Sequence, residues 1–293
     1  MQVQEPALLR GSYTGAWAGR RRRLAGRAAL FLFLALVGVL FLLPFYWMII
    51  SSIRPVADYF NLPMPIIPQR LSLENYQKLF ARTLFLRGMA NTAFLAIVSV
   101  ITQVFCCALA GYTFAKLRFK GRDPLFIGIL ATMMVPAGVG MIPNYIMMSR
   151  LHWINTYWPL IVPGVANAFG IFWMRQYCLS VPDELIDAAR IDGAGEFAIF
   201  WRIILPIISP ALASLAIFVF LGTWNEFLGP LVYLRSSELF TVQLWLSVVS
   251  QLGEVKQPFV VMAGAVLASV PILVMFVTLQ RYFVSGLTLG SIK

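Results

Sequence analysis

The stretch AALFLFLALVGVLFLLPFYWMII, residues 28–50, carries no charge and is long enough to cross a bilayer as a helix. Phe45, Tyr46 and Trp47 near its end form an aromatic belt typical of a membrane interface. Arginines precede this stretch, as they do in a secretory signal. However, its apolar run is longer than a signal core, and no small-x-small cleavage site follows. We therefore expect a retained first transmembrane helix.

The composition extends this conclusion to the whole chain of 293 residues. Apolar residues make up 60% of it and charged residues 12%, which leaves too few charges to solvate the surface of a soluble domain. Five further apolar stretches of about 20 residues follow the first. They cover residues 89–113, 124–147, 157–177, 207–233 and 259–281. We predict an all-α integral membrane protein with six transmembrane helices, a basic N-terminal segment 1–27 and a C-terminal tail 282–293.

The formal net charge of +11 is distributed as a topology signal. Lys and Arg cluster beside the apolar stretches, above all in residues 20–27 and in the short loop 116–122. Basic residues are enriched on the cytoplasmic side of membrane proteins. The sequence therefore predicts that both termini and the loop 116–122 are cytoplasmic, and it argues against nucleic-acid binding.

The residues needed for catalysis or metal binding are scarce. The single histidine, His152, cannot build a metal site alone, and Cys106, Cys107 and Cys178 lack the spacing of zinc ligands. The chain contains no GxxxxGK[ST] phosphate loop. We expect no catalytic residue, no bound metal and no cofactor, and we expect that this chain does not hydrolyse ATP.

Three features modify the simple six-helix picture. The proline-rich loop 51–88 contains SLENYQKLF, residues 72–80, which predicts a short amphipathic helix capped near Ser72. Pro136 and Pro143, with glycines between them, predict a kink in the third transmembrane helix. Gln103 and Asn167 are polar residues within predicted spans, and interhelical packing is the expected role of each.

The segment SVPDELIDAARIDGAGEFAIFWRIILP, residues 180–206, separates the fourth and fifth spans and holds five of the twelve acidic residues. Ser180 and Asp183 have the spacing of a capping box, and Gly193 and Gly195 offer a stop, so we predict a helix over 182–192. Its small residues let another surface approach closely. By itself the pattern fits an ordinary connecting loop or a helix that docks into a cytoplasmic partner.

The same segment resembles a known motif. Asp187-Ala188-Ala189, three residues, Gly193, nine residues and Ile203-x-Leu205-Pro206 are similar to the EAA loop of binding-protein-dependent ABC importer permeases. The stretches RIDGAG and WNEFLGPL resemble the carbohydrate branch of these permeases, and the likeness runs from about residue 28 to the C-terminus. Asp187 stands where the family usually has Glu, so the carboxylate is one methylene shorter.

The resemblance implies a type I ABC importer fold, in which residues 182–192 are a coupling helix that docks into a separate ATPase. The docking residues it implies are Glu184, Asp187, Ala188, Ala189, Asp192, Gly193 and Ala194. It also implies three protein partners: a homologous second permease, a cytoplasmic ATPase dimer that uses ATP and Mg²⁺, and an extracellular or periplasmic solute-binding protein. The chain would then be a lipid-embedded sugar permease of a bacterial or archaeal cytoplasmic membrane.

Glu226 is the least expected residue in the predicted spans, because an ionisable group in a membrane is costly. Together with Trp224 and Asn225 it could contact a sugar in a substrate pathway, or the polar pair could form interhelical hydrogen bonds or a gate. Gly229 and Pro230 directly afterwards should loosen the helix. Two other functions stay open: a permease for a solute that is not a sugar, and an ion-coupled secondary transporter.

Overall fold

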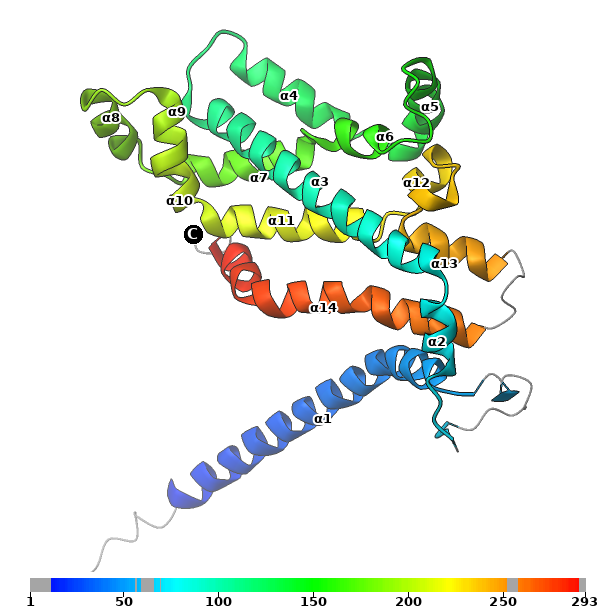
Figure 1. The fold of residues 1–293 in the computed structure, drawn as a ribbon. Coiled ribbons are helices and arrows are strands. Elements are labelled where there is room, and N and C mark those ends of the chain that lie inside the picture. The colour runs from blue at the N-terminus through cyan, green and yellow to red at the C-terminus, as the bar shows by residue number, and fades with distance from the viewer. Residues whose placement is uncertain (1–11, 56, 59–65, 69, 252–257, 290–293) are drawn as a thin grey trace, which may run out of the picture.

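The computed structural model describes residues 12–55, 57–58, 66–68, 70–251 and 258–289, and these residues form helices and connections without a strand. This confirms the predicted all-α class. Three helices are long and apolar enough to cross a membrane (Figure 1). They are α1 (Ser12–Ser52), α3 (Thr83–Lys116) and α14 (Pro258–Leu289), and they contain the first, second and sixth predicted spans.

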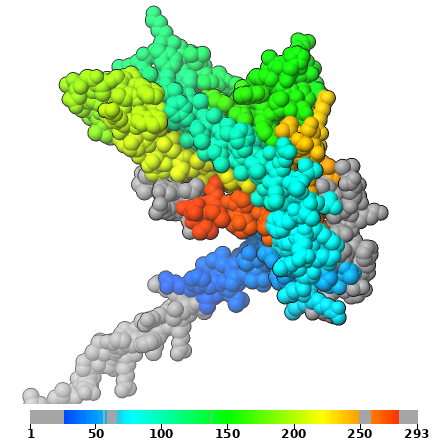
Figure 2. All heavy atoms as spheres, in the orientation of Figure 1, coloured from blue at the N-terminus to red at the C-terminus, as the bar shows by residue number. Residues whose placement is uncertain are grey.

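Helix α1 stands apart from the rest of the chain. In Figure 1 and Figure 2 it projects away from the other helices and meets them near its C-terminal end. None of its apolar stretch is buried within this chain. Its end is attached to α2 (Glu74–Phe80), because the Asn75 side-chain amide donates to the carbonyl oxygens of Ser52 at 2.9 Å and Arg54 at 2.7 Å.

Helix α2 is the short helix predicted over residues 72–80. The hydroxyl oxygen of Ser72 accepts a hydrogen bond from the backbone N–H of Glu74 at 3.2 Å, as expected for a residue at this end of a helix. Its Leu79 is fully buried against α3, α13 (Val242–Gln251) and α14. Helix α2 thereby joins α1 to one end of the helical body.

The other three predicted spans are interrupted helices. The stretch 124–147 divides at Pro136, so the predicted kink is a complete interruption. The pieces of the three interrupted stretches are, in chain order, α4 (Arg122–Thr132), η2 (Ala137–Gly140), α5 (Met141–Arg150), α6 (Trp158–Ile161), η3 (Val162–Gly164), α7 (Ala168–Leu179), α11 (Ser209–Trp224) and α12 (Leu228–Tyr233). The 3-10 turn η5 (Ser237–Leu239) then leads to α13.

The larger core lies between α3, α7 and α11. Cys107 and Ala108 of α3 are fully buried there, as is Met174 of α7. The residues of α3 at this crossing are small because α7 lies close to them. At Gly111 the backbone of α7 comes so near that an added Cβ would lie 2.5 Å from the Met174 Cβ. Cys107 and Cys178 are therefore packing residues.

Candidate functional site

The connection between α7 and α11 contains the predicted coupling helix. Helix α8 runs from Asp183 to Ile191, within the predicted 182–192. The predicted capping box is wrong. Pro182 occupies the N-cap, and the Ser180 hydroxyl donates instead to the carbonyl oxygen of Tyr177 at 2.8 Å. Asp183 and Glu184 lie in the first turn, where carboxylates complement the helix dipole.

The C-terminus of α8 is closed by a Schellman turn. The N–H of Gly193 donates to the carbonyl of Arg190 at 3.0 Å, and the N–H of Ala194 donates to the carbonyl of Ala189 at 2.9 Å. Gly193 has φ +85°, a left-handed conformation that favours glycine. The predicted stop at Gly193 is confirmed. Gly195 plays no such part, because its φ is −71°.

Helix α8 has one buried and one exposed face. Ile186 and Ala189 are buried in the core, and Ala194 packs against the same cluster. The opposite face is exposed and combines acidic with apolar side chains; its members are Glu184, Leu185, Asp187, Ala188, Ile191 and Asp192. Ala189 and Ala194 were predicted to face a partner. Ala189 faces this chain's own core because helical spacing places it on the side of Ile186, and the Schellman turn folds the half-buried Ala194 back against the same core. Their small size brings α8 close to that core.

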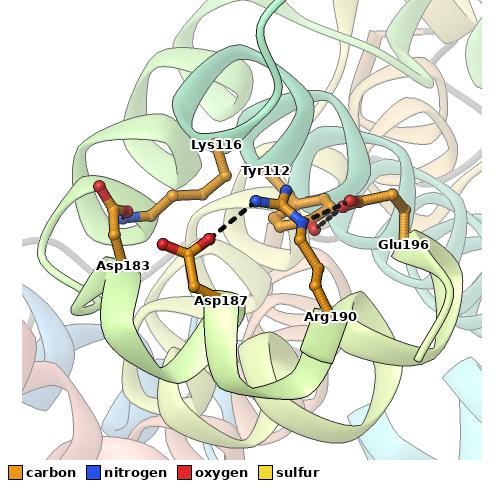
Figure 3. A network of polar contacts seen from close by, with 6 residues as sticks. All are labelled: Tyr112, Lys116, Asp183, Asp187, Arg190 and Glu196. Atoms are coloured by element: carbon orange, nitrogen blue, oxygen red, sulfur yellow. Dashed lines mark hydrogen bonds and ion pairs between the residues drawn. The ribbon is translucent and has the colours of Figure 1, made fainter. Parts of the chain in front are cut away.

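Lys116, the last residue of α3, ties down the start of α8 (Figure 3). Its side chain is only 6% exposed, and its ammonium donates to the carbonyl of Val181 and to Oδ1 of Asp183, both at 2.6 Å. The Lys116 ammonium holds the pKa of the Asp183 carboxyl below its ordinary value. One buried cation therefore joins α3 to the first residue of α8 and to the backbone just before it.

A second group of contacts ties the end of α8 to α3. The guanidinium of Arg190 donates to Oε1 of Glu196 at 2.8 Å and to Oδ1 of Asp187 at 3.2 Å. The Tyr112 hydroxyl of α3 donates to the other oxygen of Glu196 at 2.5 Å (Figure 3). The Arg190 guanidinium lowers the pKa of the Glu196 carboxyl, and the hydrogen bond from Tyr112 acts in the same direction.

Sequence reasoning did not assign this network of Tyr112, Lys116, Arg190 and Glu196. Lys116 and Arg190 counted only as topology signals, and Tyr112 lies within an apolar stretch. The one usable signal was the set of opposite charges on either side of Gly193, because a Schellman turn brings the residues that flank it back together.

The network leads directly into an irregular helix. After Gly195 the chain forms α9 (Glu196–Ile199), the π-helical turn η4 (Phe200–Ile204) and α10 (Leu205–Ile207). The axis then bends by 81° into α11. Ile203, Leu205 and Pro206 of the motif lie in this irregular part, and π-turns occur frequently at functional sites. This irregular segment is the part of the chain that connects α8 to α11.

The predicted pathway residues occupy the break between α11 and α12. Trp224 is 2% exposed, and its indole N–H donates to the carbonyl of Ala268 in α14 at 3.0 Å. Trp224 thus joins two helices and does not face a pathway, a correction that follows from its burial. Asn225 and Glu226 are exposed, and Oε1 of Glu226 accepts the N–H of Gly229 at 2.9 Å. The helix is interrupted between Trp224 and Leu228, and the Glu226 side chain accepts a hydrogen bond from the first turn of α12.

The arrangement around α8 is suited to binding. Among the described residues no group of three His, Cys, Asp or Glu side chains could hold a metal ion. An open cleft of about 790 Å³ separates α8 from residues 115–122, and charges of both signs line it. A fixed helix with an exposed acidic and apolar face beside such a cleft has the features that suit a protein partner.

Comparison with known proteins identifies the family of this chain. Residues 107–288 match the family described as "Binding-protein-dependent transport system inner membrane component". The chain is 37% identical over 267 residues to the arabinooligosaccharides transport system permease protein AraQ of Halalkalibacterium halodurans, covering 90% of this chain and 94% of that protein. It is 34% identical to the lactose transport system permease protein LacG of Rhizobium radiobacter, covering 89% and 94%.

A solved structure extends the similarity to three dimensions. A chain in the crystal structure of a bacterial ABC transporter involved in the import of the acidic polysaccharide alginate superposes with a TM-score of 0.81. It is 27% identical in sequence, and the match covers 90% of this chain and 98% of that one. The chain belongs to the family of inner membrane components of binding-protein-dependent transport systems.

Proposed function

We propose that this chain is a permease subunit of an ATP-driven ABC importer for carbohydrates. The observation that carries the proposal is α8: an exposed acidic and apolar face, fixed by a Schellman turn and by Lys116, within the region that matches the family. The relatives named above are permeases for arabinooligosaccharides and lactose, which supports a carbohydrate as the solute.

In this proposal α8 is a cytoplasmic coupling helix. Asp187 presents a carboxylate that is 64% exposed, and Ile191, at 86%, is the most exposed apolar side chain of the helix. An apolar side chain exposed to this degree loses its contact with water when it enters a groove of a partner, and that burial favours docking. The ATPase binds the ATP and Mg²⁺, and this chain contributes the docking face.

In this proposal the chain crosses the membrane six times. Three of the spans are the long helices α1, α3 and α14, and the other three are the interrupted helices. Both termini and the loop 116–122 lie in the cytoplasm of a bacterium or archaeon. The exposed apolar surface of α1 faces lipid or the homologous second permease, and an external solute-binding protein delivers the solute. A solved neighbour, the alginate transporter, forms a complex with an alginate-bound periplasmic protein, and this supports the last element.

Site-specific crosslinking tests the docking face. A photoreactive amino acid at Ile191 should crosslink to the ATPase when the full transporter is assembled. The matched control is Val277 of α14, which is 63% exposed but belongs to an apolar membrane-length helix. Crosslinks to the ATPase from Val277 and not from Ile191 would refute the assignment of α8 as the docking helix.

Two further measurements separate the proposal from its alternatives. Cysteine labelling in a Cys-less background tests the topology, because a cysteine in 116–122 should not react with an impermeant reagent added from outside. Uptake by the purified chain alone, driven by an ion gradient without an ATPase, would support a secondary transporter instead.

A further inference from the structure

A cleft of about 620 Å³ lies between α3, α4, α7 and α11, away from α8. Four transmembrane segments meet there, and each contributes lining side chains. The residues that line it include Gln103, Thr132, Asn167, Phe169, Phe218 and Thr223. Every lining residue is uncharged. A volume of this size is ordinary for a small-molecule site.

Within the part of the chain that the structure describes, each of the two side-chain amides in this cleft uses only one of its two polar groups. Gln103 donates through Nε2 to the carbonyl of Gly164, which leaves its amide oxygen as an acceptor. Asn167 accepts the N–H of Gly170 through Oδ1 at 2.6 Å, which leaves its NH₂ group as a donor. A free acceptor and a free donor on neighbouring walls match a hydroxyl, which both donates and accepts.

Aromatic rings form another part of the wall. Phe169 and Phe218 meet edge to face with their centroids 6.0 Å apart, and Trp173 packs against both behind them. These contacts hold the two rings in place, while 39% of Phe169 and 37% of Phe218 remain exposed. Ring faces of this kind suit the C–H faces of a sugar, as the amides suit its hydroxyls.

We propose that this cleft is a subsite for a neutral sugar unit on the solute's route through the permease, an inference that rests on the proposed carbohydrate function. The substrate class is a neutral oligosaccharide. A uronate would bring a carboxylate into a cleft without a cation, where its lost hydration would not be replaced. Gln103, Asn167 and Thr223 replace Trp224 as the residues that contact the solute.

Gly222 allows a direct test, because it lines the cleft in α11 and has open space around its Cβ position. Gly222→Leu therefore places a bulky side chain at the wall of the cleft, and its Cβ meets no atom of this chain within 4 Å. Gly128→Leu is the matched control: Gly128 lies within α4, also has open space, and does not line the cleft. Thr223→Val removes one lining hydroxyl and keeps the shape of the side chain.

The experiment uses the complete importer, with its binding protein, ATPase and second permease, in proteoliposomes. The probes are arabinotriose and maltotriose as neutral sugars and trigalacturonate as the acidic one. We expect uptake of a neutral probe by the wild type, a fall of at least about tenfold in Gly222→Leu, and no fall in Gly128→Leu. Thr223→Val should raise the half-saturating concentration and leave the maximal rate unchanged, because it removes one hydrogen bond.

Each failure has a separate meaning. Absence of uptake of all three probes by the wild type would count against the proposed function itself. Normal uptake by Gly222→Leu beside an active wild type would overturn the subsite alone, and preferred uptake of trigalacturonate would overturn the neutral class. Loss of the second permease from the purified Gly222→Leu complex would show that a protein surface covers the cleft, and would also overturn the subsite.

Discussion

Substitution of Gly193 gives the sharpest test of the proposed coupling role of α8. Gly193 has φ +85°, and an added Cβ would have no atom of this chain within 4 Å. The cost to the isolated permease therefore comes from the backbone conformation and not from crowding. A left-handed residue with a Cβ costs about 1–2 kcal/mol, and Asn tolerates that conformation better than Ala or Leu.

The size of this strain sets the expected effect. A cost of about 1–2 kcal/mol changes an equilibrium by roughly 5- to 30-fold. In Gly193→Ala the closed Schellman turn should lose population by that factor, and Gly193→Asn should lose less. Leu has the same backbone strain as Ala, and the Cβ position of Gly193 has no atom of this chain within 4 Å. We therefore attribute any additional effect of Gly193→Leu to the surface of the proposed partner.

The assay measures three quantities for each variant in proteoliposomes: the ATPase retained on purification, the rate of ATP hydrolysis and the rate of solute uptake. We expect uptake per ATP hydrolysed to fall in the order wild type, Asn, Ala, Leu, with ATPase retention falling furthest in Leu. The apolar spans lie outside this loop, so the amount of permease in the membrane should not change.

Two outcomes would refute the reasoning. Equal coupling in the wild type, Ala and Leu variants would show that the turn at Gly193 does not transmit the ATPase's movement. Equal ATPase retention in Ala and Leu, with both impaired in uptake, would show that Gly193 shapes the loop but does not face the partner.

Three other predictions follow from the contacts around α8 and α11. Lys116→Met removes the ammonium that bonds Val181 and Asp183, and amide exchange in α8 should speed up about three- to tenfold. Asp183 and Glu196 have pKa values below the ordinary 3.8 and 4.5, so their contacts are complete above about pH 4.5 and are lost only as the pH falls through the lowered values. ATPase retention should therefore be constant from pH 8 to 5 and fall only in stronger acid, as these carboxylates become protonated. Trp224→Phe loses the hydrogen bond to α14 and should lower the free energy of unfolding by about 1 kcal/mol in a thermal melt, while a normal Tm would contradict the packing role.

Local patterns were sufficient where neighbouring residues decide the structure. An uncharged stretch of 23 residues predicts α1 because a single segment can satisfy its own backbone hydrogen bonds in a membrane only as a helix. The end of α8 at Gly193 could likewise be predicted from the sequence, since the left-handed residue that often follows a helix is usually glycine. The capping box at Ser180 failed because the hydroxyl had a nearer acceptor in the preceding helix, an alternative that a spacing rule does not weigh.

By itself the sequence determined the all-α membrane class, the position of α8 and the family motif, because each depends on residues within one or two helical turns. Only the tertiary structure decided which face of α8 is free, that Trp224 is buried, and that Lys116 holds Asp183 across 67 positions of the chain. Hydrophobic spacing predicts which face of a helix is buried but not which residues cover that face. Two charged residues far apart in the sequence give no indication that they form an ion pair in the fold. The distances between α3 and α8 are set by the packing of α3 against α7 and α11, and that packing depends on side chains from the whole chain at once.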